Sequence, residues 1–214
     1  MLRAFASLIQ VALDTILPRK ERVVRIDAYS IEDIPVSPVE HEILGAEITT
    51  LLEYKTQVVQ DLVKALKYDR AGGAAKLLSG ALAEYLREEI ANIHAFSAQP
   101  IILMPVPLHA SRIRERGFNQ IEKVLQYLPP EFQDGTLSRI DATSLVRTRA
   151  TPQQTRLSRR ERLRNVEGAF EVLYDVGDAH IILIDDVTTT GATLTEAARP
   201  LTGKNVRLLT LAHA

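Results

Sequence analysis

The sequence predicts an α/β fold in which a central parallel sheet is flanked by helices. Residues 101–104 and 181–184 are short, uninterrupted apolar runs, as expected for strands that are buried on both faces of a sheet. Helical patterns lie between these and the other candidate strands. Such an alternation of strands and helices is typical of a parallel sheet.

Length and composition limit the classes of protein to which the chain can belong. The 214 residues suit one domain, alone or with an appendage, and 46% of them are hydrophobic. We divide the chain into an N-terminal helix with a poorly defined segment, residues 1–46, and a main domain, residues 47–214. Because cysteine is absent, disulfides, thiol catalysis and cysteine-ligated zinc are excluded. No segment approaches the ~20 apolar residues of a membrane span, and no signal peptide is recognisable, so a cytoplasmic protein is expected.

The N-terminal half is expected to contain three helices and two strands. Apolar residues at helical spacing predict helices over residues 2–16, 58–66 and 74–90. The strand candidates are residues 23–26 and 47–54.

The C-terminal half is expected to contain most of the sheet. The strand at 101–104 breaks at Pro105, and a polar, irregular segment precedes a helix near Ile121. A later helix starts near Gly191, with Thr193 and Glu196 at the spacing of a capping box. The remaining elements are strands at 144–146, 169–173 and 206–211, a loop at 147–158 and a short basic helix at 158–164.

The most informative segment follows the apolar run at 181–184. Two adjacent carboxylates, Asp185 and Asp186, come directly after it, and a threonine-rich turn leads through Gly191 into a helix. Backbone N–H groups and hydroxyls at such a turn bind anions. Gly191 would allow a phosphate to approach closely, and a side chain there would fill the cradle. Two carboxylates beside a phosphate cradle suit a ligand with a phosphate and a vicinal diol, which is a ribose phosphate.

Other interpretations of this segment are weaker. A strand, turn and helix without a ligand would leave two adjacent carboxylates partly desolvated at no benefit. A nucleoside triphosphatase would need the motif G-x-x-x-x-G-K-[ST], and a dinucleotide site would need G-x-G-x-x-G. Neither motif is present.

Basic residues are concentrated in two segments. Arg112, Arg114 and Arg116 follow the strand at 101–104, and residues 145–164 contain seven arginines with one acidic residue. We interpret the longer segment as a mobile loop that closes over an active site. A nucleic-acid contact and a solvated surface remain alternatives for it. Ordinary surface charge remains an alternative for the shorter segment, because residues two apart diverge on a helix.

Several segments resemble the ComF family of phosphoribosyltransferase-like proteins, within the type I phosphoribosyltransferase superfamily. The resemblance runs from about residue 47 to the C-terminus, and its strongest part is the phosphoribosyl-pyrophosphate motif at 181–194, IILIDDVTTTGATL. The other matching motifs are Leu-Lys-Tyr at 66–68, Pro-Val-Pro-Leu at 105–108, Arg-Gly-Phe-Asn-Gln at 116–120, Leu-Val-Arg-Thr-Arg at 145–149, Thr-Pro-Gln-Gln at 151–154, Glu-Arg-Leu-Arg-Asn-Val at 161–166 and Gly-Ala-Phe at 168–170.

The resemblance implies a type I phosphoribosyltransferase fold with a small N-terminal hood, and it implies roles for particular residues. The ribose 2′- and 3′-hydroxyls would be held by Asp185 and Asp186. The 5′-phosphate would be held by Thr189, Thr190, Gly191, Ala192 and Thr193. Pyrophosphate would be met by Pro107, Leu108, Arg112 and Arg116. The catalytic residues would be Asp185, Asp186, Arg147 and Arg149.

The implied activity is transfer of phosphoribose from phosphoribosyl pyrophosphate to an unidentified base or amine. Mg²⁺ is expected to come with the pyrophosphate and not on protein ligands. The family's usual N-terminal zinc module is absent or replaced, because the chain has no cysteine. Two alternatives stay open: a non-catalytic competence or DNA-uptake accessory protein that binds single-stranded DNA or protein partners, and a regulator that senses phosphoribosyl pyrophosphate. A nucleoside monophosphate is an alternative ligand, and a homodimer is one assembly left open.

Overall fold

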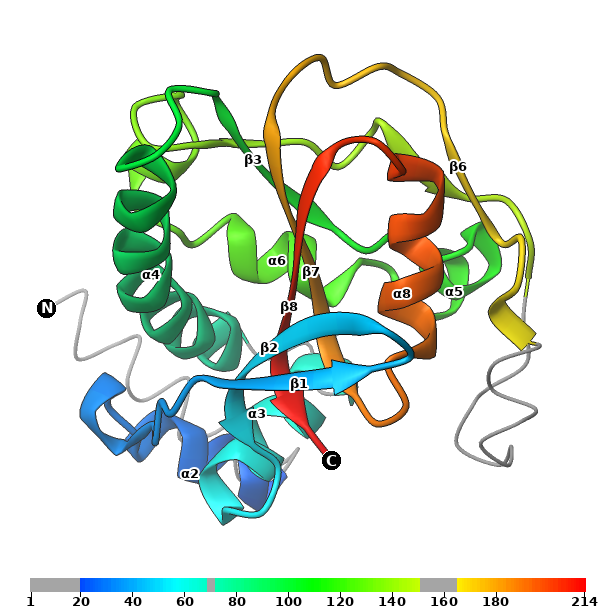
Figure 1. Ribbon diagram of the computed structural model, residues 1–214. Helices are drawn as coiled ribbons and strands as arrows, with labels where there is room; N and C mark the ends of the chain where they lie inside the picture. Colours follow the sequence, from blue (N-terminus) through cyan, green and yellow to red (C-terminus); the bar gives the residue numbers. More distant parts are fainter. Residues whose placement is uncertain (1–19, 69–71, 151–164) are drawn as a thin grey trace, which may run out of the picture.

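A six-stranded sheet forms the centre of the protein (Figure 1). The structure is a computed structural model that describes residues 20–68, 72–150 and 165–214. The strand order is β1-β2-β8-β7-β3-β4, in which β1 runs antiparallel to β2 and all other neighbours are parallel. The predicted α/β fold with a mainly parallel sheet is therefore confirmed.

The described elements alternate along the chain as the sequence predicts. The strands of the main sheet are β1 (Val39–Ile43), β2 (Ala46–Glu53), β3 (Ile101–Pro105), β4 (Arg139–Ile140), β7 (His180–Thr188) and β8 (Asn205–His213). The helices are α2 (Glu21–Ala28), α3 (Gln57–Tyr68), α4 (Gly72–His94), α5 (Ala110–Arg116), α6 (Gln120–Leu125) and α8 (Ala192–Ala198), with short 3-10 turns at Ile31–Asp33, Pro130–Phe132 and Arg199–Leu201. A separate antiparallel pair is formed by β5 (Leu145–Arg147) and β6 (Phe170–Val172).

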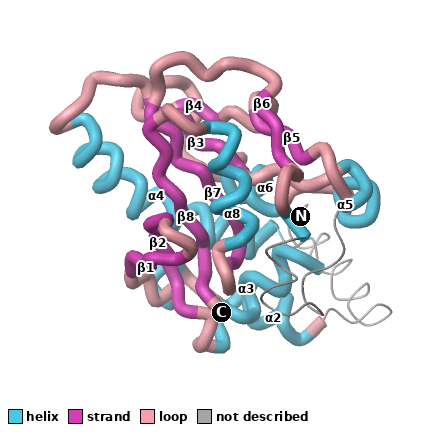
Figure 2. Tube along the Cα trace, turned by 45° about the vertical axis from the view of Figure 1, so that its right-hand side comes forward, coloured by secondary structure: helices cyan, strands magenta, loops and turns pink. Residues whose placement is uncertain are grey.

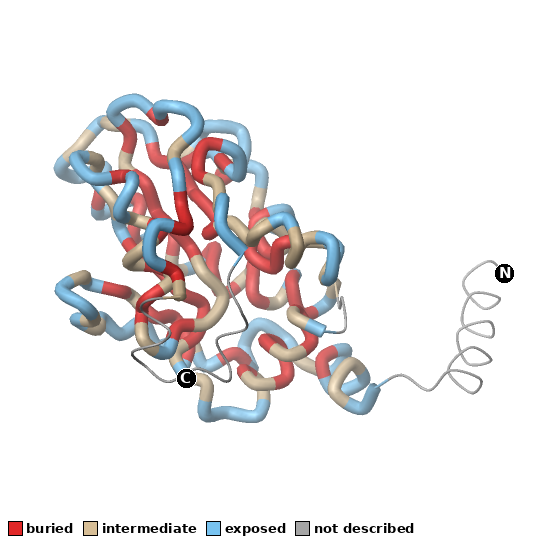
Figure 3. The backbone as a smooth tube through the Cα atoms, turned by 90° about the vertical axis from the view of Figure 1, so that its right-hand side faces the viewer, coloured by how far each residue is buried: buried red, intermediate tan, exposed pale blue. Residues whose placement is uncertain are grey.

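Helices cover both faces of the main sheet. On one face, Ile182 and Ile184 of β7 belong to a core that includes side chains of α3, α4 and α6. On the other face, Ile181 and Leu183 belong to a second core with Leu194 of α8. All four β7 residues are at most 1% exposed, and the buried trace runs through the centre of the molecule (Figure 3). The apolar run at 181–184 is uninterrupted because both of its faces meet a hydrophobic core.

Strand β7 is longer than the apolar run predicts. It continues through both carboxylates to Thr188, where it pairs with His213 at the end of β8. Asp185 pairs with Thr210 and Val187 pairs with Ala212, so the sheet holds the segment on both sides of Asp186, and the threonine-rich turn begins only after Thr188.

The predicted strand at 23–26 is wrong, because these residues lie within helix α2. Only Ile26 of this helix is buried, as expected for a helix that meets the body along one narrow stripe. Arg25 docks the helix on α3: its Nε and Nη2 donate to Asp61 at 2.7 and 2.9 Å. The β-branched pair Val23-Val24 suggested a strand, but this tertiary ion pair favours the helix. The predicted helices at 2–16 and 158–164 lie outside the described residues.

Two features of the turn before α8 differ from expectation. Gly191 is the N-cap in a left-handed conformation (φ 69°), and no side chain of the described residues caps the helix, so the capping box of Thr193 and Glu196 is wrong. Glu196 instead accepts a hydrogen bond from the backbone N–H of Gly168 at 2.8 Å. A Cβ at Gly191 would lie 2.7 Å from Ile43 Cγ2 and 2.9 Å from Ile48 Cδ1. A side chain at 191 would therefore enter the core under the β1–β2 hairpin, and not a phosphate cradle.

No helix in the described ranges has the length and apolar character needed to cross a membrane.

We predict that Gly191→Val lowers the free energy of unfolding by about 2–5 kcal/mol, combining left-handed strain with overpacking against Ile43 and Ile48. The matched control is Gly177→Val, since Gly177 has a φ of 68° but a Cβ there would meet no atom of the described residues within 4 Å. Urea unfolding should show a larger loss for the Gly191 variant. Equal losses would show that only backbone strain acts at Gly191.

Candidate functional site

A cavity of about 400 Å³ lies at the carboxyl ends of β3 and β7. This edge is where ligands bind in open α/β sheets. Segments that are distant in sequence contribute to its wall. The lining residues are Tyr54, Val63, Lys67, Tyr68, Val106, Pro107, Leu108, His109, Arg112, Arg116, Asn119, Gln120, Ile121, Arg147, Asp185, Asp186, Val187, Thr189, Thr193 and Ala214.

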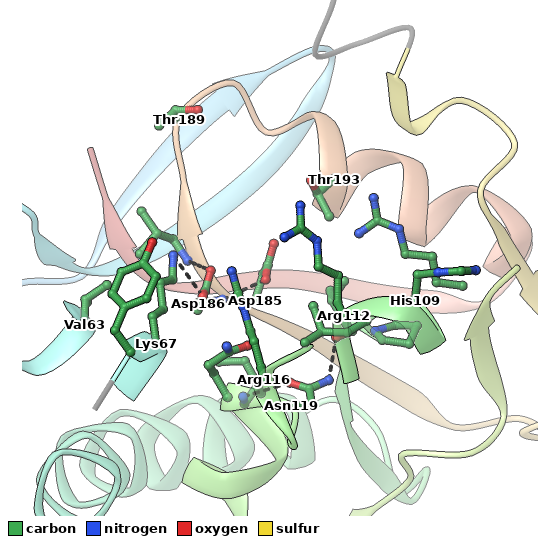
Figure 4. A pocket seen from close by; sticks show the side chains of 18 of the residues that line it. Val63, Lys67, His109, Arg112, Arg116, Asn119, Asp185, Asp186, Thr189 and Thr193 are labelled. Carbon is green, nitrogen blue, oxygen red and sulfur yellow. Dashed lines mark hydrogen bonds and ion pairs between the residues drawn. The ribbon is translucent and has the colours of Figure 1, made fainter. Parts of the chain in front are cut away.

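The two carboxylates of β7 both line this cavity. Asp186 forms an ion pair with Lys67, whose Nζ lies 3.0 Å from Oδ2, and both side chains are largely buried, at 21% and 16% exposed for Lys67 and Asp186. Asp185 Oδ1 accepts a hydrogen bond from the backbone N–H of Asp186 at 2.8 Å. Figure 4 shows Lys67 on one side of the carboxylates and Arg112 of α5 on the other. The acid pair is thus held by the strand and balanced by charge from outside the strand.

The surroundings shift the pKa of Asp185 and the pKa of Lys67. Desolvation is the main cause that raises the pKa of Asp185, to about 7, and the neighbouring charge of Asp186 adds to it. The cations of Lys67 and Arg147 oppose this rise. Burial by itself would lower the pKa of Lys67, but the Asp186 carboxylate outweighs it and raises that pKa. Lys67 therefore stays charged, and burial beside Asp186 makes the Asp185 carboxyl hold its proton more tightly than an exposed aspartate does.

Helix α5 presents two arginines to the cavity. The sequence suggested an irregular turn here, but Ala110–Arg116 is helical, begins at the N-cap His109 and ends at Gly117 in a left-handed conformation. His109 Nδ1 accepts from the backbone N–H of Ser111 at 3.2 Å. Arg112 and Arg116 are four residues apart and share one helix face, so both line the cavity, whereas Arg114 does not.

Arg147 enters the cavity from the β5–β6 pair, which lies beside α5 (Figure 2). Its guanidinium carbon lies 5.2 Å from the centre of the Phe170 ring on the paired strand, within range of a cation–π contact. Burial lowers the pKa of Arg147, and the charge of Asp185 opposes that shift. Within the described cavity wall, four cations (Lys67, Arg112, Arg116 and Arg147) therefore face two carboxylates.

The turn after β3 is held in place by a buried amide. Asn119, only 3% exposed, donates from Nδ2 to the carbonyl of Val106 at 2.9 Å and accepts from the backbone N–H of Ile121. Val106 itself donates from its backbone N–H to the carbonyl of Ile184 at 2.8 Å. These bonds fix Pro107 and Leu108 at the cavity wall, next to the end of β7.

The structure brings together most of the residues that the sequence analysis selected. The residues that line the cavity are Asp185, Asp186, Thr189, Thr193, Pro107, Leu108, Arg112, Arg116 and Arg147. Thr190, Gly191 and Ala192 do not line it, and the backbone N–H of Gly191 donates to Thr188 Oγ1 at 3.0 Å. Arg149 also lies outside the wall, because its guanidinium donates to the carbonyls of Asn165 and Glu167. Most of the arginine-rich segment, residues 151–164, lies outside the described residues.

Sequence reasoning missed Lys67, His109 and Asn119 as polar contributors to the site. Lys67 and Asn119 stand in the matching motifs Leu-Lys-Tyr and Arg-Gly-Phe-Asn-Gln, and His109 directly follows Pro-Val-Pro-Leu. Their position within or next to these motifs was therefore the available signal. The local sequence around Lys67 gave no signal of its ion pair, because that pair joins the end of α3 to the end of β7.

We predict that Asp185→Asn gains stability relative to the native protein as pH rises. The raised pKa means that the folded state holds the Asp185 proton more tightly than the unfolded state, so native stability falls between about pH 4 and pH 7. Asparagine removes that loss. Since each pKa unit corresponds to about 1.4 kcal/mol, we expect the stability difference to change by on the order of 1–3 kcal/mol between pH 5 and pH 8. Urea unfolding at both values measures it, and a pH-independent difference would contradict the assignment.

Comparison with known proteins finds relatives of this chain. No family model matches the chain. It is 34% identical over 155 residues to the DNA utilization protein YhgH of Escherichia coli O6:H1, covering 72% of this chain and 65% of that protein. It is 32% identical over 105 residues to competence protein F of Haemophilus influenzae (48% and 44% covered) and 36% identical over 104 residues to competence protein ComFC of Bacillus subtilis (48% and 39%). The chain thus spans less than two thirds of the length of these relatives.

The mainly parallel α/β sheet is the fold that the resemblance to phosphoribosyltransferase-like proteins implies. Through these relatives the chain is similar to proteins of the ComF family. Among solved structures it is similar to a hypoxanthine phosphoribosyltransferase from Staphylococcus aureus, with 12% identity, a TM-score of 0.33, and 63% of this chain and 61% of the other covered.

Proposed function

We propose that this protein binds phosphoribosyl pyrophosphate or a related ribose 5-phosphate in the cavity at the end of β7, and transfers the phosphoribose to a base or amine. The observation that carries the proposal is the combination of one acid pair and four cations in the described wall of a single cavity. Carboxylates accept hydrogen bonds from a vicinal diol, and the excess of cations suits a polyanion. The ligand class with both features is a phosphorylated ribose.

The proposed roles follow from the position of each group. Asp185 and Asp186 accept hydrogen bonds from the ribose hydroxyls, and their negative charge stabilises the positive charge that develops on the ring as the bond from C1′ to pyrophosphate breaks. Arg112 and Arg116 then stabilise the departing pyrophosphate, next to the turn at Pro107 and Leu108. The 5′-phosphate would lie by Thr189 and Thr193, the two members of the predicted phosphate set that line the cavity.

Magnesium fits this site as a companion of the ligand. Mg²⁺ prefers six oxygen ligands, and the described cavity wall offers two carboxylates, one of which is already paired with Lys67. Pyrophosphate oxygens and water would therefore supply most of its ligands. When bound, the ion would neutralise charge on the leaving pyrophosphate.

We predict that Arg116→Gln weakens binding of phosphoribosyl pyrophosphate with Mg²⁺ by roughly 10- to 100-fold, the loss of one charge-assisted contact. The matched control is Arg114→Gln on the same helix, which removes the same charge outside the cavity and should change binding little. Isothermal titration calorimetry measures both affinities. Equal affinities for the two variants would place the ligand elsewhere. Pyrophosphate release with a panel of bases then distinguishes an enzyme from a regulator that only senses the ligand.

A second candidate function is favoured by the names of the relatives, which refer to DNA utilization and competence. Under it, the protein is an accessory factor whose arginine-rich segment at 145–164 contacts single-stranded DNA. In the same calorimetry, a single-stranded oligonucleotide would then bind with a log–log salt slope of about −0.7 per phosphate neutralised, and without competition from phosphoribosyl pyrophosphate. Oligonucleotide binding combined with no binding of the sugar phosphate would replace the first proposal with this one.

A further inference from the structure

Arg147 reaches the cavity from a small pair of strands that lies outside the main sheet. It is the last residue of β5, and it pairs with Phe170, the first residue of β6. The Phe170 ring also contacts the guanidinium, with the ring centre 5.2 Å from the guanidinium carbon. The position of this cation in the cavity therefore depends on the contacts that fix the start of β6.

The turn that leads into β6 is tied to helix α8 by one carboxylate. Gly168, two residues before Phe170, donates from its backbone N–H to Glu196 Oε1 at 2.8 Å. Gly168 has a left-handed φ of 63°, and the next residue, Ala169, donates from its backbone N–H to the carbonyl of Val166 at 3.1 Å. The side chain of Glu196 is only 17% exposed, and hydrogen bonds to an ionised acceptor are among the stronger ones. This contact holds the turn against α8.

Glu196 belongs to the helix that follows the threonine-rich turn. It lies three residues after Thr193, which lines the cavity, and so one helical turn further along α8. On the side of β5, the backbone N–H of Thr148 donates to the carbonyl of Ala169 at 2.9 Å, directly after Arg147. A continuous chain of contacts thus runs from the wall at Thr193, through Glu196 and the turn, to Arg147.

Arg149 holds the same turn from the other strand. It follows the end of β5 by two residues, and its Nη2 donates to the carbonyl of Asn165, at 3.3 Å, and to the carbonyl of Glu167. A guanidinium that bridges these two carbonyls joins the chain after β5 to the chain before β6. Because Arg149 lies outside the cavity wall, these contacts position its neighbours and do not reach a ligand.

We infer that Glu196 and Arg149 are positioning residues, which hold the β5–β6 pair so that Arg147 projects into the cavity. This assignment goes beyond the proposed function, because it concerns how the cationic wall is built, whichever anion binds there. It gives Arg149 a positioning role in place of the catalytic role that the family resemblance implies. Only its consequence for the binding of phosphoribosyl pyrophosphate rests on the proposed function.

Three substitutions on α8 isolate the contact of Glu196 with the turn. Glu196→Ala removes the acceptor for the Gly168 N–H, whereas Glu196→Gln keeps a side-chain oxygen at the same place and should rescue the contact. The matched control is Arg199→Gln, because Arg199 also contacts Glu196 Oε1, at 3.4 Å, but does not belong to the β5–β6 pair. Since Glu196 lies outside both hydrophobic cores, each variant should remain folded, which its melting curve checks.

The first measurement needs no ligand. The ring current of Phe170 shifts the NMR signal of the Arg147 side-chain Nε–H group, and this signal is assigned by its loss in Arg147→Gln. We expect Glu196→Ala and Arg149→Gln to move the signal toward the position of an exposed arginine, and Glu196→Gln and Arg199→Gln to leave it in place. An unmoved signal in either of the first two variants would overturn the inference, as would an equal shift in Arg199→Gln.

The second measurement is a double-mutant cycle on the affinity for phosphoribosyl pyrophosphate with Mg²⁺, by calorimetry. Arg147→Gln should weaken binding by roughly tenfold, and Glu196→Ala by roughly three- to tenfold. The double variant should bind no more weakly than Arg147→Gln alone, because Glu196 acts through Arg147. Losses that add up in the double variant would show that Glu196 acts independently of Arg147, and the inference would be wrong.

The two measurements separate the inference from the proposed function. If the Arg147 signal moves as expected but the wild-type protein does not bind phosphoribosyl pyrophosphate, the positioning roles are supported and the proposed function is wrong. If the wild-type protein binds this ligand but the Arg147 signal stays in place in Glu196→Ala, the inference is wrong and the proposed function stands.

Discussion

Two adjacent carboxylates at the end of a buried strand repel each other and lose hydration, so the surrounding structure must supply compensating charge. Lys67 meets Asp186 at 3.0 Å, and Arg147 contributes its charge toward Asp185. These cations come from the end of α3 and from β5, and α5 adds two arginines to the same cavity wall. The charge balance at Asp185 and Asp186 therefore connects elements that are far apart in the sequence.

The arrangement of charge also separates this cavity from a second one, of about 360 Å³, at the ends of β2 and β8. The first cavity has an excess of cations around the acid pair, whereas Glu53 and Lys55 of the second pair with each other at its rim. Tyr54 lies on the boundary and lines both. The acid pair and the excess of cations in the first cavity are the physical basis of the proposed binding of a phosphorylated sugar.

Elements whose signal is local could be predicted from the sequence. The run at 181–184 is apolar on both faces because both faces meet a core, and the carboxylates that follow it line the cavity at the end of β7. The turn at Pro107 and Leu108 was likewise visible as a break after an apolar strand. In these cases a short stretch of residues determines its own local structure, so the sequence pattern alone was enough to predict it.

Features that depend on distant partners could not be predicted. The helix α2 is held by Arg25 on Asp61, so local β-branched residues at 23–24 misled the assignment. Arg147 and Arg149 looked equivalent in sequence, but β5 ends at Arg147, and Arg149 turns to backbone carbonyls near Glu167. Gly191 was expected at a ligand, although the side chains of Ile43 and Ile48 explain why a glycine fits there. Each of these outcomes depends on tertiary contacts.

The central claim is that the acid pair of β7 is the ribose-binding part of a cationic cavity. A crystal structure of the protein with ribose 5-phosphate tests it most directly. We expect the ribose hydroxyls within hydrogen-bond distance of Asp185 and Asp186, and the phosphate beside Thr189 and Thr193. A sugar phosphate bound outside this cavity would contradict the claim. A sugar phosphate bound inside it, with no ribose hydroxyl within hydrogen-bond distance of Asp185 or Asp186, would also contradict it.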